Sequence, residues 1–63
     1  MIVLIWHEGD LLLESDDWHG PLPPIGEVVW SDVNGWYKIE AIEWELYKNR
    51  CRVQIYCEEV WEE

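Results

Sequence analysis

The carboxylates and glycines of the chain are the first residues to consider for chemistry. Glycosidase-type catalysis needs two carboxylates held across a cleft, with one of them in an apolar site. The chain has 14 Asp and Glu residues, but neither spacing nor apolar neighbours sets any pair apart. Gly9, Gly20, Gly26 and Gly35 are scattered rather than gathered in a phosphate-binding loop. The sequence therefore predicts no catalytic or cofactor motif, and we expect a protein that is not an enzyme and holds no cofactor.

The histidines offer one alternative, a metal site. His7, Asp16, Asp17 and His19 could supply the nitrogen and oxygen ligands of zinc or a similar ion. No short-spaced pair of His or Cys residues supports this. The favoured interpretation is a packed or edge histidine at position 7 and a loop histidine at position 19, with no metal.

Cys51 and Cys57 are the only cysteines, and both fall at predicted inward positions of the last strand. Strand residues that far apart are separated by about 20 Å, whereas a disulfide needs Cα atoms within about 7 Å. The sequence predicts buried free thiols in a reducing compartment, with an intermolecular disulfide as the alternative. It contains no apolar run of about 18 residues and no basic segment before the apolar residues 2–6. We therefore expect a cytoplasmic protein.

Charge is the most distinctive property of the sequence. The formal net charge is −10, residues 1–37 contain no Lys or Arg, and Lys48, Arg50 and Arg52 cluster near one turn. Such a surface repels nucleic-acid phosphates and anionic lipid, so we expect neither direct nucleic-acid binding nor membrane binding. A basic protein is the favoured partner. The alternative is that the acidic residues only keep a small, aromatic-rich protein soluble.

Carboxylates spaced along strands and loops can imitate nucleic-acid phosphates, and Trp is enriched at the desolvated centres of interfaces. The predicted partner-binding residues are of these two types: Asp16, Asp17, Trp18, Trp36, Glu40, Glu43, Glu45 and Trp61. Trp18 has a second interpretation, in which it caps an open end of the fold. The first functional hypothesis is a binding module that blocks or modulates a basic protein, such as a nucleic-acid-processing enzyme.

Five predicted strands must position these residues, at roughly residues 2–7, 11–15, 27–33, 36–47 and 50–58, with a loop at 16–26. Gly and Pro residues in the loop disfavour a strand there, and no stretch has a helical period. We predict an all-β fold in one small domain over residues 1–63. The strands would form a small five-stranded barrel or a strongly bent antiparallel meander. Six Trp and three Tyr would give this short chain a dense core.

The Asn34-Gly35 dipeptide sets the predicted register of the third and fourth strands. Asn and Gly tolerate the positive φ that a two-residue type I′ turn requires. Such a turn pairs Val33 with Trp36, Trp30 with Ile39 and Val28 with Ala41. The face predicted to be buried then carries Val28, Trp30, Tyr37, Ile39 and Ala41.

A turn around Lys48-Asn49 sets the register of the last two strands. A loop of either two or four residues produces the inward pairs Ile42 with Ile55, Trp44 with Val53 and Leu46 with Cys51. The solvated face pairs Glu43 with Gln54 and Glu45 with Arg52. The inward positions change parity between Ala41 and Ile42, which predicts a β-bulge or sharp bend there.

Gly9-Asp10 predicts a type II′ turn for the first hairpin, and a three-residue turn through Glu8 is the alternative. The type II′ turn places Trp6 opposite Leu13 and His7 opposite Leu12. One face then carries Ile2, Leu4, Trp6, Leu11 and Leu13, and the other carries Val3, Ile5 and Leu12. An uncovered second face would be an interface. The second functional hypothesis is a structural or adaptor module that forms a homodimer through it.

Residues 21–58 contain PLPPIGEVVW, then NGWYKI, then a long strand and a closing hairpin. This pattern resembles the small SH3-like β-barrel proteins found in phages and mobile elements. The resemblance implies an SH3-like fold and, by analogy, a host-directed inhibitor of restriction, CRISPR or transcription machinery. No residue matches a named inhibitor's motif, so the resemblance assigns no site residue.

Overall fold

The computed structural model describes residues 1–32 and 35–60 of the chain. It contains five strands: β1 (Ile2–His7), β2 (Asp10–Ser15), β3 (Val28–Ser31), β4 (Gly35–Tyr47) and β5 (Arg50–Val60). Residues 16–27 connect β2 to β3. The predicted all-β fold class is confirmed.

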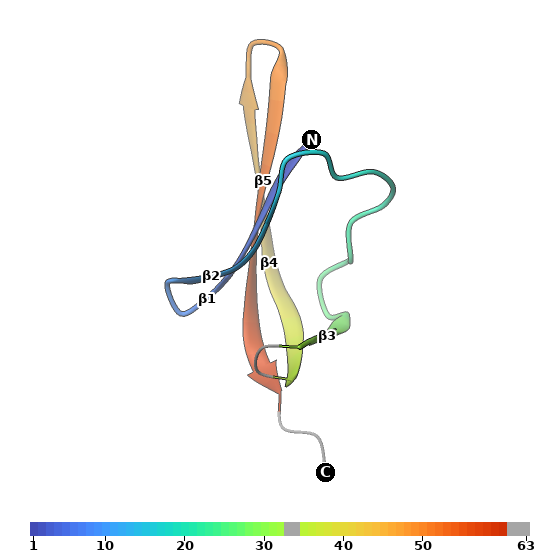
Figure 1. The fold of residues 1–63 in the computed structure, drawn as a ribbon, viewed down its shortest axis with the longest axis vertical. Helices are drawn as coiled ribbons and strands as arrows, with labels where there is room; N and C mark the ends of the chain where they lie inside the picture. Colours follow the sequence, from blue (N-terminus) through green and yellow to red (C-terminus); the bar gives the residue numbers. More distant parts are fainter. Residues whose placement is uncertain (33–34, 61–63) are drawn as a thin grey trace.

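The strands form one sheet in the order β2-β1-β5-β4-β3 (Figure 1). The pairs β1–β2, β3–β4 and β4–β5 are antiparallel, whereas β1 lies parallel to β5. The sheet curls into a half-barrel, which is compatible with a small SH3-like barrel or a bent meander. The parallel pair connects the first hairpin to the three-stranded meander, and it leaves β2 and β3 at the two edges.

The β4–β5 hairpin has the predicted register. The observed pairs include Ile42 with Ile55, Trp44 with Val53, Leu46 with Cys51, Glu43 with Gln54 and Glu45 with Arg52. Lys48 and Asn49 form the turn between paired Tyr47 and Arg50. The predicted bulge is also present, because the register shifts between Ile39 and Ala41 and leaves Glu40 as the extra residue.

The predicted register of β3 and β4 is wrong. Trp30 pairs with Trp36 rather than with Ile39, and Val28 pairs with Lys38 rather than with Ala41. Because this register differs from the predicted one by an odd number of residues, the side chains of β3 exchange faces. Val28 and Trp30 are therefore 42% and 62% exposed instead of buried. The predicted Val33–Trp36 pair and the Asn34 half of the turn lie outside the described residues.

Ala41, which was also predicted to be buried, is exposed. It follows the bulged Glu40 and pairs with Tyr56 on the outer face of the sheet. Tyr37 and Ile39 lie before the bulge and are buried as predicted. The side chains that face the core therefore change from odd-numbered to even-numbered positions one residue earlier than the sequence indicated.

The predicted register of the first hairpin is wrong as well. The turn residues are Glu8 and Gly9, with φ angles of 48° and 84°, and positive φ at both positions is characteristic of a type I′ turn. Trp6 consequently pairs with Leu11, and a register shift then places Ile5 opposite Leu13. Gly9 is the second turn residue rather than the first, which moves β2 relative to the predicted type II′ hairpin.

The core lies on the concave face of the curled sheet. Its buried residues are Val3, Tyr37, Ile39, Val53, Ile55 and Cys57, and Ile5 and Leu12 pack against them. The face of Val3, Ile5 and Leu12 was predicted to need an external cover. Instead it belongs to the core, so it cannot serve as the predicted dimer surface.

The distal half of the β4–β5 hairpin extends beyond this core. β4 has 13 residues and β5 has 11, whereas β1 and β2 have six each. The molecule measures 44 × 21 × 19 Å, and the hairpin end stands clear of the other elements (Figure 1). Trp44 and Leu46, predicted to be buried, are therefore 56% and 78% exposed. Val53, opposite Trp44, remains buried because β1 flanks it.

The core assignment predicts different effects for two truncations. Ile39→Ala should lower the free energy of unfolding by about 2–5 kcal/mol, because Ile39 is fully buried. Leu46→Ala, the matched control, should change it by no more than about 0.5 kcal/mol because its side chain is exposed. Urea denaturation followed by Trp fluorescence measures both. Equal losses in the two variants would contradict a core that ends before the hairpin tip.

Candidate protein-binding surface

The predicted partner-binding residues do not form one continuous site. Asp16 and Asp17 are exposed in the connection after β2, and Trp36 is 38% exposed near the start of β4. Glu40, at the bulge, and Glu43 are exposed along β4, and Glu45 is half-buried farther along it. Trp61 lies outside the described residues. The carboxylates therefore occupy at least two separate surfaces.

Trp18 is partly buried. Its backbone N–H donates to the Met1 carbonyl oxygen at 3.0 Å, which holds the connection beside the start of β1. Its side chain packs against the core, and its indole Nε1 is buried without an acceptor among the described residues. The structure thus supports the interpretation of Trp18 as a cap.

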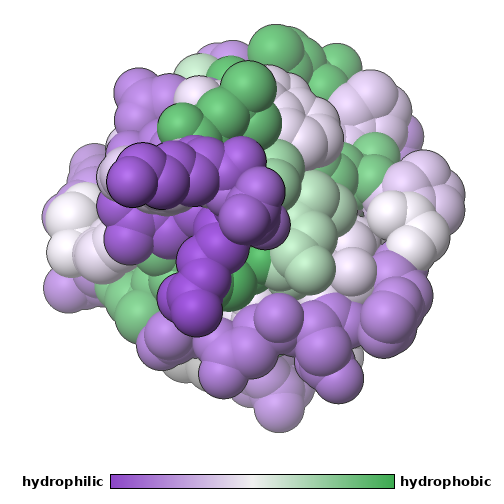
Figure 2. Space-filling view, turned by 90° about the horizontal axis from the view of Figure 1, so that it is seen from above, coloured by the Kyte–Doolittle hydropathy of each residue, from purple (hydrophilic) through white to green (hydrophobic). Residues whose placement is uncertain are grey.

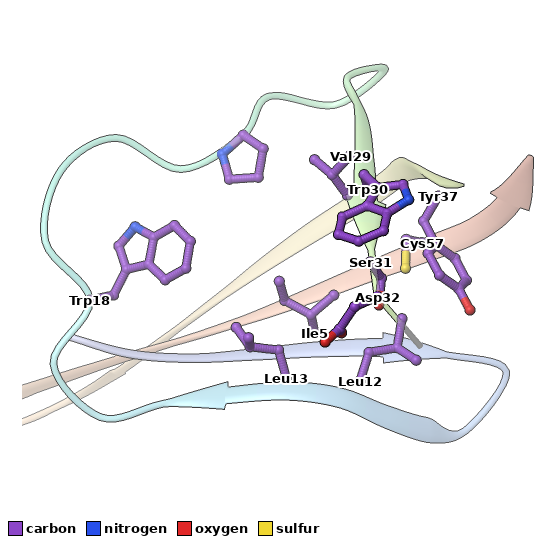
Figure 3. A pocket seen from close by; sticks show the side chains of 11 residues that line it. Ile5, Leu12, Leu13, Trp18, Val29, Trp30, Ser31, Asp32, Tyr37 and Cys57 are labelled. Carbon is purple, nitrogen blue, oxygen red and sulfur yellow. The ribbon is translucent and has the colours of Figure 1, made fainter. Parts of the chain in front are cut away.

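A cavity of about 390 Å³ lies on the concave side of the sheet. Figure 3 shows Trp18 of the connection and Val29 and Trp30 of β3 across from Ile5 and Leu13 of the first hairpin. Most of the lining is apolar. Tyr37 also lines the cavity, but its hydroxyl is closed off from solvent and has no hydrogen-bond partner in the described part of the chain.

The outer face of the β4–β5 hairpin carries a polar cluster around Arg52. The Arg52 Nε donates to Glu45 Oε1 at 2.5 Å, and Nη2 donates to the Tyr47 hydroxyl at 3.1 Å. Gln54 Nε2 donates to the same Glu45 oxygen at 3.1 Å. The hydrogen bonds from Arg52 and then Gln54 lower the pKa of Glu45, and the bond to Glu45 raises the pKa of Arg52. Within residues 1–32 and 35–60, Glu43 makes no ion pair.

The exposed charges are distributed unevenly. Lys48 and Arg50 are exposed at the hairpin turn, and the view onto that end shows strongly hydrophilic residues in front of hydrophobic surface (Figure 2). Away from the turn, Lys38 is the one exposed basic residue that the structure describes. The exposed acidic residues are Glu8, Asp10, Glu14, Asp16, Asp17, Glu27, Asp32, Glu40, Glu43 and Glu58. The molecule therefore has one basic end and an acidic body.

The histidines and cysteines are placed separately. His7 packs edge-on against Tyr37, with ring centroids 5.1 Å apart, and His19 is exposed. No three His, Cys, Asp or Glu residues in the described ranges come together as a metal site. Both cysteines are free thiols, and burial raises the pKa of Cys57, whose Sγ donates to the Trp6 carbonyl oxygen at 3.3 Å. This thiol is not activated as a nucleophile.

Two exposed tryptophans were missed by the sequence analysis. Trp30 lies directly opposite Trp36, and Trp44 lies on the uncovered part of the hairpin. The exposure of Trp44 has a signal in the sequence, because the predicted fourth strand is about twice as long as the first two. The exposure of Trp30 has none, because it depends on the register that the turn between β3 and β4 sets.

Among the described residues, no helix has the length and hydropathy needed to cross a membrane.

The unpaired hydroxyl of Tyr37 leads to a prediction about stability. Tyr37→Phe should leave the free energy of unfolding unchanged or raise it by up to about 1 kcal/mol, because it removes a buried polar group that has no partner. Tyr56→Phe, at a partly exposed position, is the control and should have little effect. Urea denaturation measures both variants. A loss of more than about 1 kcal/mol in Tyr37→Phe would mean that the hydroxyl is hydrogen-bonded in solution.

The Glu45–Arg52 pair leads to a prediction about pH. Because the folded-state pKa of Glu45 is lowered from 4.5, its contribution to stability is present above that pH and is lost as the pH falls through the lowered value. Glu45→Gln should therefore be less stable than Glu43→Gln at pH 7. Glu43→Gln removes the same charge from the same face and is the matched control. The difference in urea midpoint should shrink below pH 4.5; a difference independent of pH would contradict the ion pair.

Comparison of the chain with protein-family models, curated proteins and solved structures gives no match. The likeness to SH3-like barrel proteins of phages therefore remains a resemblance in sequence pattern. The candidate surface is defined by the exposure, charge and pairing of the residues described above.

Proposed function

We propose that the chain is a non-enzymatic module that binds the basic, nucleic-acid-binding surface of a partner protein. The observation that carries this proposal is the acidic body. Ten side-chain carboxylates are exposed, whereas Lys38 is the one exposed Lys or Arg that the structure describes away from the hairpin turn. A positively charged cleft built to hold phosphates would attract this surface over a long range.

The strand geometry supports mimicry of a nucleic-acid backbone. Alternate residues of a strand, such as Glu43 and Glu45, lie on the same face and are about 7 Å apart along it. B-DNA carries one phosphate per about 3.4 Å of helix axis on each strand, and consecutive phosphates lie farther apart than this through space because the backbone winds around the axis. The spacing of carboxylates at alternate strand positions is therefore of the same order as that of neighbouring phosphates. Since Glu45 is already bonded to Arg52, Glu43 is the stronger mimic on this face.

Exposed tryptophans supply the apolar part of the proposed interface. Trp30 and Trp36 are directly opposed in neighbouring strands and are 62% and 38% exposed. Large aromatic side chains that are buried on binding contribute much of the affinity of protein interfaces. We therefore assign to Trp30 the anchoring role that the sequence suggested for Trp18, because Trp18 is partly buried against the core.

The setting we propose is the cytoplasm of a phage-infected cell or of a cell carrying a mobile element. Two free thiols suit a reducing compartment, and the SH3-like resemblance points to host-directed inhibitors. The second candidate, a homo-oligomeric adaptor, would have to use a surface other than the buried Val3, Ile5 and Leu12. The exposed Trp44 and Leu46 are the residues that favour it.

Capture followed by quantitative binding tests the proposal. Immobilised protein would be exposed to a lysate of the native host, and each retained protein would be purified and its Kd measured at 50 and 200 mM NaCl. We expect a basic nucleic-acid-handling protein whose Kd rises at least about tenfold over this range. Double-stranded DNA should compete for it. A complex that is indifferent to both salt and DNA would contradict the mimicry.

Paired charge variants provide the control for this measurement. The double variant Glu27→Gln, Glu40→Gln removes two exposed acidic charges from the body, and Lys48→Gln, Arg50→Gln removes two exposed basic charges from the turn. The first should weaken the complex, and the second should leave it unchanged or strengthen it. The opposite order would place the basic turn, rather than the acidic body, at the interface.

A further inference from the structure

We infer that the open flank of β4, defined as residues 40–47, binds an extended segment of the partner in which basic and apolar residues alternate. The segment would pair with β4 as a sixth strand of the sheet. This inference rests on the proposed function, because it assumes a basic partner. It goes further by assigning the position and the chemical pattern of the bound segment.

The flank begins where the neighbours of β4 end. β3 pairs with β4 only as far as Lys38. Beyond it, the Gly26 N–H donates to the Ile39 carbonyl oxygen at 2.8 Å, and the Ile39 N–H donates to the Glu27 carbonyl oxygen at 2.9 Å. From residue 40 onward, no described backbone lies paired on this side of β4, and the hairpin stands clear in Figure 1. A row of unpaired backbone donors and acceptors of this kind can accept another strand.

The two faces of the flank define the side chains of its occupant. On the inner face, half-buried Ile42 and exposed Trp44 and Leu46 form an apolar row. On the outer face, Glu43 makes no ion pair in the described ranges, and Tyr47 presents an exposed aromatic ring. Neighbouring strands place their side chains beside each other on the same face. An added strand therefore needs apolar residues on one face and Lys or Arg on the other.

A second copy of the chain does not fit this pattern. Antiparallel pairing of two copies centred on Trp44 would place Glu43 of each copy opposite Glu45 of the other. Arg52 already pairs with Glu45 within each copy, so the uncompensated charges in such a dimer are the two Glu43 carboxylates. Each copy also has a net charge of −10, which repels the other copy. The flank contains no Lys or Pro, the residues that commonly block an exposed edge. Its carboxylates thus disfavour self-pairing and favour a basic strand.

The other edge of the sheet is a poorer docking site. β2 has six residues, and its register shifts between Ile5 and Trp6 of the neighbouring β1. A bulge in the middle of so short a strand interrupts the regular spacing of its backbone groups. The flank of β4 has its bulge at Glu40, at one end, and keeps an uninterrupted register from Ala41 to Tyr47.

Three synthetic peptides test the inference on the full chain. The probe is a heptapeptide in which Lys and Val alternate. One control has the same composition with all Lys residues in one block, and a second has the alternating sequence with every other backbone amide N-methylated. All three carry the same charge, so general attraction to the acidic body affects them equally. Isothermal titration measures affinity, and amide hydrogen exchange locates the bound peptide.

We expect the alternating peptide to bind at least about tenfold more tightly than either control. It should slow amide exchange within residues 42–47. Glu43→Lys should weaken it about tenfold, whereas Glu14→Lys, the same charge change on β2 at the other edge of the sheet, should have a much smaller effect. Equal binding of the three peptides, no binding of the alternating one, protection of β2 instead of β4, or a dimer in sedimentation that protects residues 42–47 would each overturn the inference.

These outcomes are separable from the test of the proposed function. Equal, salt-sensitive binding of all three peptides would overturn the strand-docking site and leave the acidic body as the binding surface. A captured partner that is indifferent to salt and DNA would overturn the mimicry, whichever peptide binds.

Discussion

The parallel pairing of β1 with β5 joins the two hairpins into one sheet. It runs from Ile2 opposite Arg52 to Trp6 opposite Tyr56 and places β5 between β1 and β4 in the sheet. Val3 and Val53 become neighbours in the core through it, and both are fully buried. Because β1 begins only at Ile2, opposite Arg52, the hairpin beyond Arg52 has no paired strand on either side among the described residues.

Local sequence signals predicted the strands well and their registers unevenly. The turn around Lys48-Asn49 was informative because loops of two and four residues produce the same pairs, and the observed register agrees. Asn34-Gly35 and Gly9-Asp10 were less so. A turn that moves by one residue changes every pair of its hairpin, as in β1–β2, and a register shift by an odd number of residues, as in β3–β4, also changes which face each side chain occupies. The parallel pair between β1 and β5 had no local signal. It joins strands far apart in the chain, and parallel strands share no turn.

In the candidate surface, too, features that depend on local sequence could be predicted, and features that depend on contacts between distant parts of the chain could not. Exposed carboxylates such as Asp16 and Glu43 follow from composition and alternation, because charged side chains are rarely buried without a partner. The tryptophans depend on tertiary contacts. Trp18 is partly buried because the connection packs it against the core, Trp30 is exposed because of the register of β3, and Trp44 is exposed because β4 extends beyond the core. A large aromatic side chain is compatible with either location, so its type alone could not decide.

The large aromatic side chains of the small core bring buried polar atoms with them. Trp6 Nε1, Trp18 Nε1 and the Tyr37 hydroxyl are buried without partners among the described residues, although buried polar groups are normally hydrogen-bonded. The chain contains no Phe, so each large ring in the core brings such an atom. Together with a net charge of −10, which opposes compaction, these atoms limit the stability of the isolated chain. Neutralisation of the acidic body by a basic partner would reduce that repulsion, and binding to the folded state alone would stabilise it further.

The carboxylates on the open flank of β4 affect both self-association of the chain and its preference for a basic segment. An exposed strand with an apolar face tends to pair with copies of itself, and Ile42, Trp44 and Leu46 supply such a face. Glu43 and Glu45 oppose that pairing, yet the Arg52 bond at 2.5 Å engages only one of them. In the complex that we propose, Glu43 would attract the basic strand. The residue that protects the edge from a second acidic copy would then also recruit the cationic segment, and the same Coulomb interaction would account for both effects.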